Sequence, residues 1–362
     1  MEEDETLALL ALHAAHGGRA GPIAGLRGAA NSFLEALAAP TRCQEFLPRG
    51  WTERAPHELL ALVRSEGGLQ RRALDMAGAR TIAATDPGYP PLLLQLADPP
   101  PLLAVQGETA VLAPPGPVLS VIGARACTPY GREQARRFGA IAGGAGVVVA
   151  SGAARGIDQA AMEGALETGG RVIAVLGSGI DRPYPPEARG LLQRIVAAGG
   201  AVVSEFPCGT PPLRHHFPQR NRILAALARA VLVVQAGELS GSMSTVRAAL
   251  ELGREVLAVP GPVDCSVSRG PHKLLREGAG IAASAQDLLD ALRSPWEGLA
   301  PQAESPVLAG LAAGDASPDA LAARLGLPIE IILLELVECE LRGRVTQVPG
   351  GLYHRCGPAE DP

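Results

Sequence analysis

The sequence has few of the features that mark common functional classes. Aromatic residues make up only 3% of its 362 residues, so the core must consist mainly of Ala, Leu and Val. It contains no Gly-x-Gly-x-x-Gly dinucleotide fingerprint and no Gly-x-x-x-x-Gly-Lys-Ser/Thr phosphate loop. These absences argue against a nicotinamide-dependent enzyme and against a P-loop ATPase.

Metal ligands and structural cysteines are equally sparse. The six cysteines are widely separated and no two have Cys-x-x-Cys spacing, which argues against a zinc site and a disulfide scaffold. The seven histidines show no metal-ligand spacing, and no His-Glu-x-x-His motif occurs. We therefore expect no metal and no cofactor, and a reducing cytoplasm is the simplest compartment.

Targeting signals and a global basic field are also missing. The acidic residues 1–5 lack the basic region of a signal peptide. The longest uncharged run, 138–154, contains five glycines, so we expect a helix end, a turn and a strand rather than a membrane span. The net charge is −5, so any nucleic-acid site must be a local patch.

Two segments precede the central part of the chain. Residues 1–80 are rich in Ala and Leu at helical spacing, with breaks expected at Gly17-Gly18 and Gly67-Gly68, and predict a small helical domain. Residues 81–117 contain three proline clusters, which exclude a long helix. We expect this lead-in to wrap against the domain that follows.

Residues 118–293 predict a doubly wound α/β domain. Short β-branched runs recur there, separated by stretches long enough for helices, at 118–122, 147–150, 172–176, 201–203, 231–235 and 255–259. Strands without polar alternation, separated by helices, indicate a parallel sheet buried on both faces. Ligands of such a sheet bind at the carboxyl ends of its strands.

After a linker over residues 294–304, residues 305–357 predict a winged-helix domain. Ser317-Pro318 begins a helix, residues 328–341 form a longer amphipathic one, and residues 345–354 form a hairpin. The longer helix carries four glutamates, with two arginines just beyond its end, at positions 330, 335, 338, 340, 342 and 344. We favour protein contact or regulation over duplex DNA binding here, although winged helices usually suggest the latter.

The segment 215–222, His-His-Phe-Pro-Gln-Arg-Asn-Arg, carries the strongest functional signal. Two arginines beside an aromatic ring suit a phosphate and a base, which indicates nucleic acid. The alternative is a polar loop that enters a helix, with Arg220 and Arg222 exposed to solvent.

Four of the predicted strands are followed by loops of small residues, at 123–125, 151–158, 177–181 and 240–244. Such loops let backbone N–H groups approach an anion, although each could also be a tight turn that needs glycine. Four arginines lie at the same edge of the sheet, Arg125, Arg155, Arg220 and Arg222, and favour the anion site. Asp158 and Asp181 could be acids of an enzyme. Alternatively, Asp158 accepts hydrogen bonds from backbone N–H groups or pairs with Arg155.

These loops, in this order, resemble the DprA family, the DNA-processing proteins of natural transformation, also called Smf. The matching strings lie at 86–93, 98–100, 121–125, 151–158, 175–186, 204–207, 215–222, 240–242 and 269–270. Ala124 stands where the family often has Ser, Met162 where it often has His, and Pro271-His272 where it often has Thr-Asn. Ala124 and Pro271 each remove a possible phosphate hydrogen bond.

The resemblance implies an extended Rossmann fold that binds single-stranded DNA non-specifically, forms a homodimer and helps load the RecA recombinase, without enzymatic activity. The DNA-contacting positions that it implies are Arg125, Ser151, Gly152, Arg155, Arg214, His215, Phe217, Arg220, Asn221, Arg222, Ser240, Gly241 and Ser242. Phe217 would supply a stacking face in a groove that all four arginines share. Replacing Arg220 and Arg222 by alanine would then abolish DNA binding while leaving the fold intact.

The alternative is a nucleotide-processing enzyme, because phosphoribohydrolases resemble this domain in outline. They carry a Pro-Gly-Gly-x-Gly-Thr-x-x-Glu loop. The corresponding stretch here, 240–248, has Arg247 and Ala248 where a carboxylate is needed, which disfavours hydrolysis.

Overall fold

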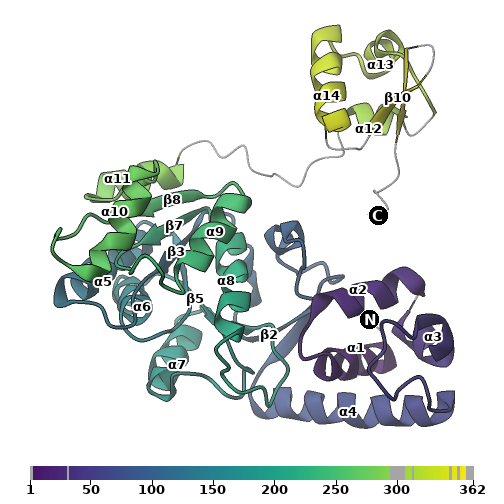
Figure 1. Ribbon diagram of the computed structural model, residues 1–362, viewed down its shortest axis with the longest axis horizontal. Helices are drawn as coiled ribbons and strands as arrows, with labels where there is room; N and C mark the ends of the chain where they lie inside the picture. Colours follow the sequence, from purple (N-terminus) through teal and green to yellow (C-terminus); the bar gives the residue numbers. More distant parts are fainter. Residues whose placement is uncertain are drawn as a thin grey trace. The chain divides into compact units, whose positions relative to one another are not determined.

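The computed structural model describes residues 3–30, 32–293, 306–311, 314–341, 345–348 and 351–355 (Figure 1). The chain forms two compact units, residues 1–294 and 295–362. Among the described helices, none has the length and apolar character needed to cross a membrane.

A nine-stranded sheet organises the first unit, in the order β1-β2-β6-β5-β4-β3-β7-β8-β9. The strands are β1 (Arg80–Ala83), β2 (Leu102–Gly107), β3 (Val118–Ile122), β4 (Val148–Ser151), β5 (Val172–Leu176), β6 (Ala201–Ser204), β7 (Ala230–Val233), β8 (Glu255–Ala258) and β9 (Gly280–Ile281). Strands β3 to β9 run parallel, which confirms the six predicted strands to within two residues at each end. The sequence analysis missed β1, β2 and β9.

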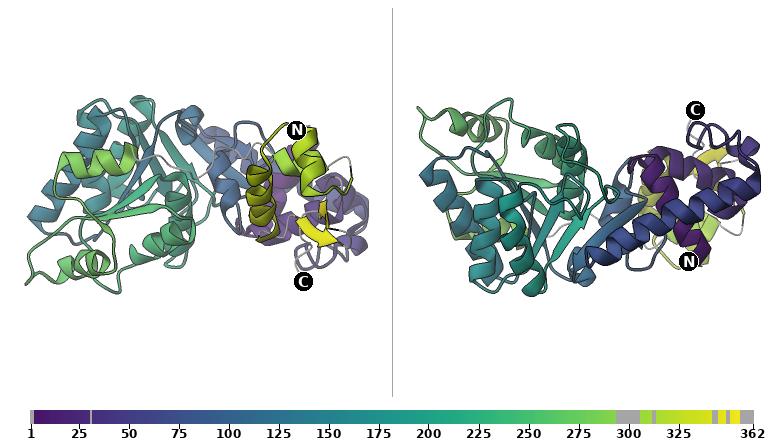
Figure 2. Two further views of the ribbon diagram at one scale, coloured as in Figure 1. Left: turned by 90° about the horizontal axis from the view of Figure 1, so that it is seen from above. Right: turned by 90° about the horizontal axis from the view of Figure 1, so that it is seen from below.

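Helices cover both faces of the sheet, as the absence of polar alternation predicted (Figure 2). They are α5 (Pro129–Gly144), α6 (Ile157–Glu167), α7 (Arg189–Ala197), α8 (His216–Leu227), α9 (Met243–Glu251), α10 (Arg269–Arg276) and α11 (Ala285–Arg293). Helices α5, α6, α7 and α11 share one hydrophobic core with the sheet. Helices α8, α9 and α10 pack on the other face, so every residue of β3 to β7 is buried.

The strand order places a crevice beside β3. From β3 the chain builds outward through β4, β5 and β6, then returns along α8 to place β7 on the other side of β3. The loops that follow β3 and β7 therefore leave the sheet in opposite directions. In doubly wound sheets this switch point is where ligands bind.

The amino-terminal helices are α1 (Glu3–Ala15), α2 (Ala20–Ala29), α3 (Phe33–Ala38) and α4 (Pro56–Met76). The chain turns at Gly17-Gly18, where both residues have positive φ, as predicted. The predicted break at Gly67-Gly68 is wrong, because α4 continues through both residues. A Cβ at Gly67 would lie 2.2 Å from the carbonyl oxygen of Leu7, so this glycine permits close packing of α1 on α4 rather than a turn.

The lead-in extends the sheet rather than only wrapping against it. Strand β2 pairs antiparallel with β6, and β1 pairs antiparallel with β2. Leu102 and Ala104 of β2 belong to the core of the amino-terminal helices. The lead-in therefore joins these helices to the α/β body.

The second unit has the predicted winged-helix layout. Its elements are α12 (Pro306–Leu311), α13 (Pro318–Leu325), α14 (Ile329–Leu341), β10 (Val345–Val348) and β11 (Leu352–Arg355). The Ser317 hydroxyl accepts a hydrogen bond from the Ala320 N–H, and β10 and β11 form an antiparallel hairpin. Part of the charge pattern expected for the recognition helix lies outside the described residues. This applies to the two arginines at 342 and 344 and to the glutamate side chains at 330 and 338.

Candidate nucleic-acid interface

A cavity of about 200 Å³ lies at the switch point. It is bounded by the loops after β3, β4 and β7 and by the first turns of α8 and α9. Its lining residues are Ile122, Gly123, Arg125, Ala154, Asp158, Phe217, Pro218, Arg220, Asn221, Leu224, Ser240, Gly241, Ser242 and Thr245. Three of the four loops of small residues thus meet at one site with residues 217–221 of the 215–222 segment.

The Phe217 ring lies close to the Arg125 guanidinium and to the backbone of Gly177. The Arg125 guanidinium carbon is 4.7 Å from the ring centre, within cation–π distance. A Cβ at Gly177 would lie 3.0 Å from the Phe217 ring, so the ring packs closely against the backbone there. The expected stacking face is therefore covered by Arg125 in this structure, and a base reaches it only when Arg125 moves.

Arg220 is a buried cation that borders the cavity. Its side chain is 3% exposed and donates a hydrogen bond to the carbonyl oxygen of Val175. Burial lowers the pKa of Arg220 to about 10, and the nearby carboxylate of Asp158 opposes that shift. The guanidinium therefore stays charged at neutral pH, and among the described residues none accepts a hydrogen bond from its buried Nε.

Asp158 accepts hydrogen bonds from the backbone N–H groups of Gly152 and Ala154, at 3.2 and 3.3 Å. Burial raises the pKa of Asp158 to about 6, against the effect of Arg220. The expected backbone role of Asp158 is thus confirmed. The suggested pairing with Arg155 is wrong, because Arg155 forms an ion pair with Glu187.

The other candidate acid, Asp181, has a similar structural role. Both of its carboxylate oxygens accept the Gly209 N–H, at 2.9 and 3.0 Å. The loop after β5 is thereby fastened to the loop after β6. Asp181 does not line the cavity.

Hydrogen bonds join the serine-rich loop after β7, residues 240–244, to the loop after β3 and to α8. The Ser242 hydroxyl donates to the carbonyl oxygen of Gly123 at 2.9 Å, which links the loops after β3 and β7. The Asn221 amide donates to the carbonyl oxygen of Gly241 at 3.2 Å and to the Ser244 hydroxyl at 2.9 Å. Thr245 lines the cavity, and its buried hydroxyl has no hydrogen-bond partner within the part of the chain that the structure describes.

Ser151 and Gly152 lie behind the cavity rather than in it. The Ser151 hydroxyl is fully buried and donates to the carbonyl oxygen of Val121 at 2.6 Å, so its expected DNA contact is not available. A Cβ at Gly152 would lie 2.3 Å from the Arg220 guanidinium. Gly152 therefore makes room for Arg220, and Ser151 joins two strands.

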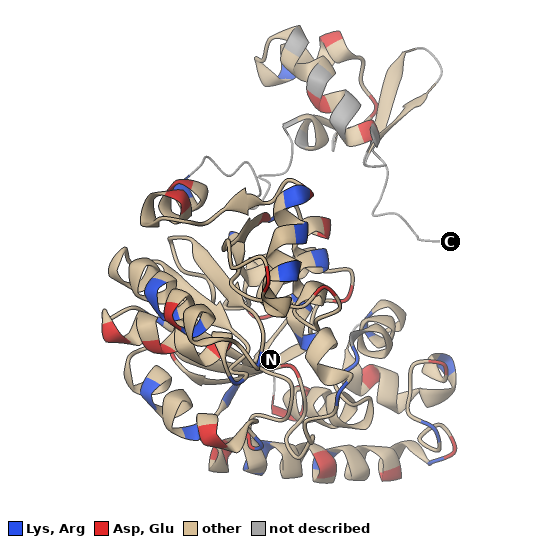
Figure 3. Cartoon of the chain, turned by 60° about the vertical axis from the view of Figure 1, so that its left-hand side comes forward, with Lys and Arg blue, Asp and Glu red and all other residues tan. Residues whose placement is uncertain are grey.

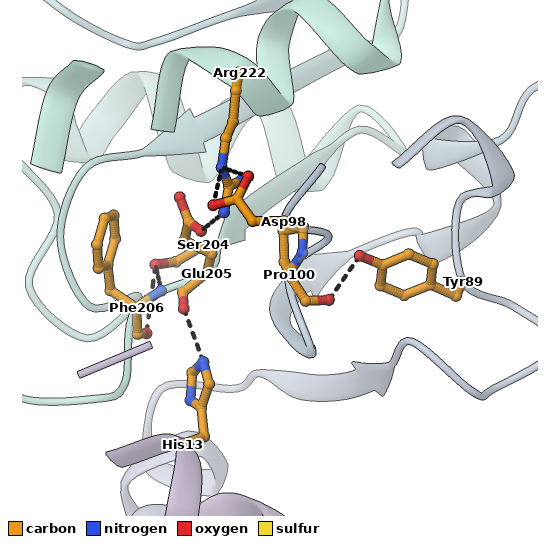
Figure 4. Close-up of polar contacts among 8 residues, drawn as sticks. All are labelled: His13, Tyr89, Asp98, Pro100, Ser204, Glu205, Phe206 and Arg222. Carbon is orange, nitrogen blue, oxygen red and sulfur yellow. Dashed lines mark hydrogen bonds and ion pairs between the residues drawn. The ribbon is translucent and has the colours of Figure 1, made fainter. Parts of the chain in front are cut away.

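Arg222 does not share the cavity with Arg220, which corrects the expectation of a common groove. Residues two apart on a helix point to different sides. Arg222 instead pairs with Glu205 at 2.7 Å and with Asp98 at 3.1 Å (Figure 4). Because Glu205 is fully buried, replacing Arg222 would leave a carboxylate uncompensated, and the double alanine substitution would therefore destabilise the fold as well as change the site.

The ion pair of Arg222 with Glu205 lies at a junction between three parts of the first unit: the amino-terminal helices, the lead-in and the α/β domain. The His13 Nε2 of α1 lies 2.9 Å from the backbone oxygen of Glu205, and Tyr89 donates to the Pro100 oxygen of the lead-in at 2.7 Å (Figure 4). Burial raises the pKa of Glu205 to about 7, against the effect of Arg222. Burial also lowers the pKa of His13 to about 4. This junction lies on the other side of α8 from the cavity.

Three predicted cations remain accessible, namely Arg125, Arg155 and Arg214, and His215 is also exposed. Arg155 lines a narrow cleft beside the cavity with Arg125, Ala154, Tyr184, Pro185 and Phe217. The sequence analysis missed Tyr184, although it lies in the 175–186 string at the same edge. In the view of Figure 3, acidic and basic residues are interspersed and alternate along α4, in keeping with a local rather than a global basic site.

Comparisons with known proteins agree over most of the chain. Residues 80–293 match the family described as DNA recombination-mediator protein A, and residues 283–351 match the DprA winged helix domain. The chain is 38% identical over 293 residues to Protein Smf of Escherichia coli (strain K12), which covers 77% of this chain and 78% of that protein.

Two solved structures are also similar. DNA processing protein A from Streptococcus pneumoniae matches with a TM-score of 0.61 and 30% identity, covering 78% of this chain and 96% of that one. DNA processing protein A from Helicobacter pylori, described by its single-stranded DNA binding mode, matches with a TM-score of 0.53 and 29% identity. That match covers 60% of this chain and 97% of the other.

Proposed function

Because the chain belongs to the DNA recombination-mediator protein A family, as its motif order predicted, we propose that it binds single-stranded DNA without reading sequence. The observation that carries this proposal is the cavity at the switch point, where exposed Arg125 covers Phe217 beside the buried cation Arg220. The described single-stranded DNA binding of the Helicobacter pylori relative supports it.

Each group at the site has a distinct part in this proposal. Arg125, Arg155 and Arg214 neutralise phosphates from the surface, and Arg220 adds a fixed positive charge within the cavity. The 240–242 loop lines the cavity at the start of α9, where the positive end of the helix dipole favours an anion. Phe217 stacks on a base once Arg125 has moved to a phosphate. Single strands are preferred because their bases are free to leave the stack.

We also propose, from the family, that a homodimer presents two such sites and helps load RecA onto the bound strand, in the cytoplasm and without chemistry on the DNA. The hydrogen bonding of Asp158 and Asp181 to backbone N–H groups supports a non-enzymatic role. Release of a free base from nucleoside monophosphates would instead support the nucleotide-processing alternative. Faster RecA assembly on oligothymidine in the presence of the protein would support loading.

Arg125→Ala and Arg214→Ala test the interface directly. Each variant should bind oligothymidine roughly 10- to 100-fold more weakly, because each loses a charge-assisted contact with phosphate. In a fluorescence-anisotropy titration, the slope of log affinity against log salt should also fall by about 0.7 per lost contact. Arg72→Ala, an exposed arginine of α4, is the control. Wild-type affinity in both interface variants would refute the proposal.

A further inference from the structure

A second aromatic ring lies beside Phe217. Tyr184 belongs to the loop after β5, and its ring centre is 6.1 Å from that of Phe217, with the two planes tilted by 59°. Both rings line the narrow cleft next to the cavity. In a chain with so few aromatic residues, the carboxyl edge of the sheet thus holds two adjacent rings.

The separation of the rings suits neighbouring bases rather than a single one. Rings 6.1 Å apart and tilted leave no parallel gap for a base between them. Stacked nucleotides follow one another at about 3.4 Å along a strand of duplex. A wider spacing fits a strand whose bases have been drawn apart and laid on separate side chains, as in other proteins that bind single strands.

The cleft is closed in this structure by two arginines. Its open volume is about 10 Å³, room for roughly one water molecule. Arg125 covers Phe217, while Arg155 at the rim is held by Glu187. The Arg155 and Glu187 side chains are 55% and 49% exposed, and exposed pairs of this kind contribute little stability. A phosphate can therefore take over either arginine and open the cleft.

We propose that Tyr184 is a second base-stacking residue, so that Phe217 and Tyr184 receive neighbouring bases as Arg125 and Arg155 turn to the flanking phosphates. The inference rests on the proposed single-stranded DNA binding and adds a residue to it. It assigns the 175–186 loop a direct contact with the bases. Until a strand arrives, Arg125 lies over the Phe217 ring and Arg155 is paired with Glu187 beside Tyr184.

The test measures how two Tyr184 variants bind two kinds of single strand. Tyr184→Leu removes the ring and keeps an apolar side chain, whereas Tyr184→Phe keeps the ring. Oligothymidine is compared with an abasic strand of equal length, which has the same phosphates and no bases. Tyr130→Leu is the control, because Tyr130 is an exposed tyrosine that does not line the cleft, whereas Tyr184 is half-buried beside it.

Tyr184→Leu should weaken oligothymidine binding by about 5- to 150-fold, the loss expected for one stacked base. It should leave binding of the abasic strand unchanged, and its salt dependence should match that of wild type, because the ring neutralises no phosphate. Tyr184→Phe and Tyr130→Leu should bind both strands as wild type does. A purely structural role would instead weaken both strands equally.

Two results would overturn the inference while leaving the proposed function standing. One is equal weakening of both strands by Tyr184→Leu, and the other is no weakening of either. Failure of the wild-type protein to bind oligothymidine would refute the proposed function itself, and the inference with it.

Discussion

The Arg222→Ala variant tests whether Arg222 stabilises the fold on one side of α8 or binds DNA on the other. Arg222 is 13% exposed and lies 2.7 Å from Glu205, which is fully buried. Removing one member of a buried ion pair leaves the other charge uncompensated and costs about 3–5 kcal/mol. Single domains have a free energy of unfolding of about 5–15 kcal/mol, so this loss is large and measurable.

The pH dependence of this loss follows from Glu205. Burial already holds the folded-state pKa of Glu205 at about 7, above its ordinary 4.5, and removing Arg222 raises it further. In both proteins the folded state keeps a proton that the unfolded state releases, so the stability of both falls as pH rises from about 4.5 to 7, and only the variant, with its higher folded-state pKa, goes on losing stability above pH 7. The destabilisation should thus be smaller at acidic pH, where the carboxyl is neutral in both proteins.

Urea denaturation followed by circular dichroism measures the free energy of unfolding at acidic and alkaline pH. Adding Glu205→Gln to Arg222→Ala should recover much of the loss, because a neutral amide replaces the buried charge. Below the unfolding transition, Arg222→Ala should bind oligothymidine with nearly wild-type affinity, unlike Arg125→Ala. If Arg222→Ala kept the wild-type urea midpoint but bound DNA more weakly, Arg222 would contact DNA. The conclusion that it stabilises the junction would then be refuted.

Two further substitutions test other features. Gly67→Ala should lower the melting temperature, with overpacking against Leu7 costing about 1–3 kcal/mol, whereas Gly68→Ala, which meets no atom within 4 Å, should raise it. A Gly67→Ala protein that melts with or above wild type would contradict the close helix contact. Glu187→Gln should tighten oligothymidine binding about 2- to 5-fold at low salt, because it frees Arg155 for phosphate and removes a repelling charge. Weaker binding would show that Glu187 positions Arg155 instead of competing for it.

Local sequence patterns were sufficient to predict the layout of the central sheet and the region of the site. Buried parallel strands are short β-branched runs without alternation, and this pattern is local, so β3 to β8 could be read directly. The carboxyl ends of parallel strands share one edge, so the small-residue loops were expected to converge there. The motif order predicted the family for the same reason, since each motif is a short local string.

Which side chains meet at that edge depends on tertiary packing, which the local patterns do not contain. The partners of Arg222 lie 17 residues away at Glu205 and 124 residues away at Asp98, so spacing along α8 could not show that it faces away from Arg220. Likewise, the sequence predicts a turn at Gly67 because the close approach of Leu7, which requires this glycine, comes from another helix. Local patterns fix backbone conformation, whereas the role of a side chain depends on which distant segment packs against it.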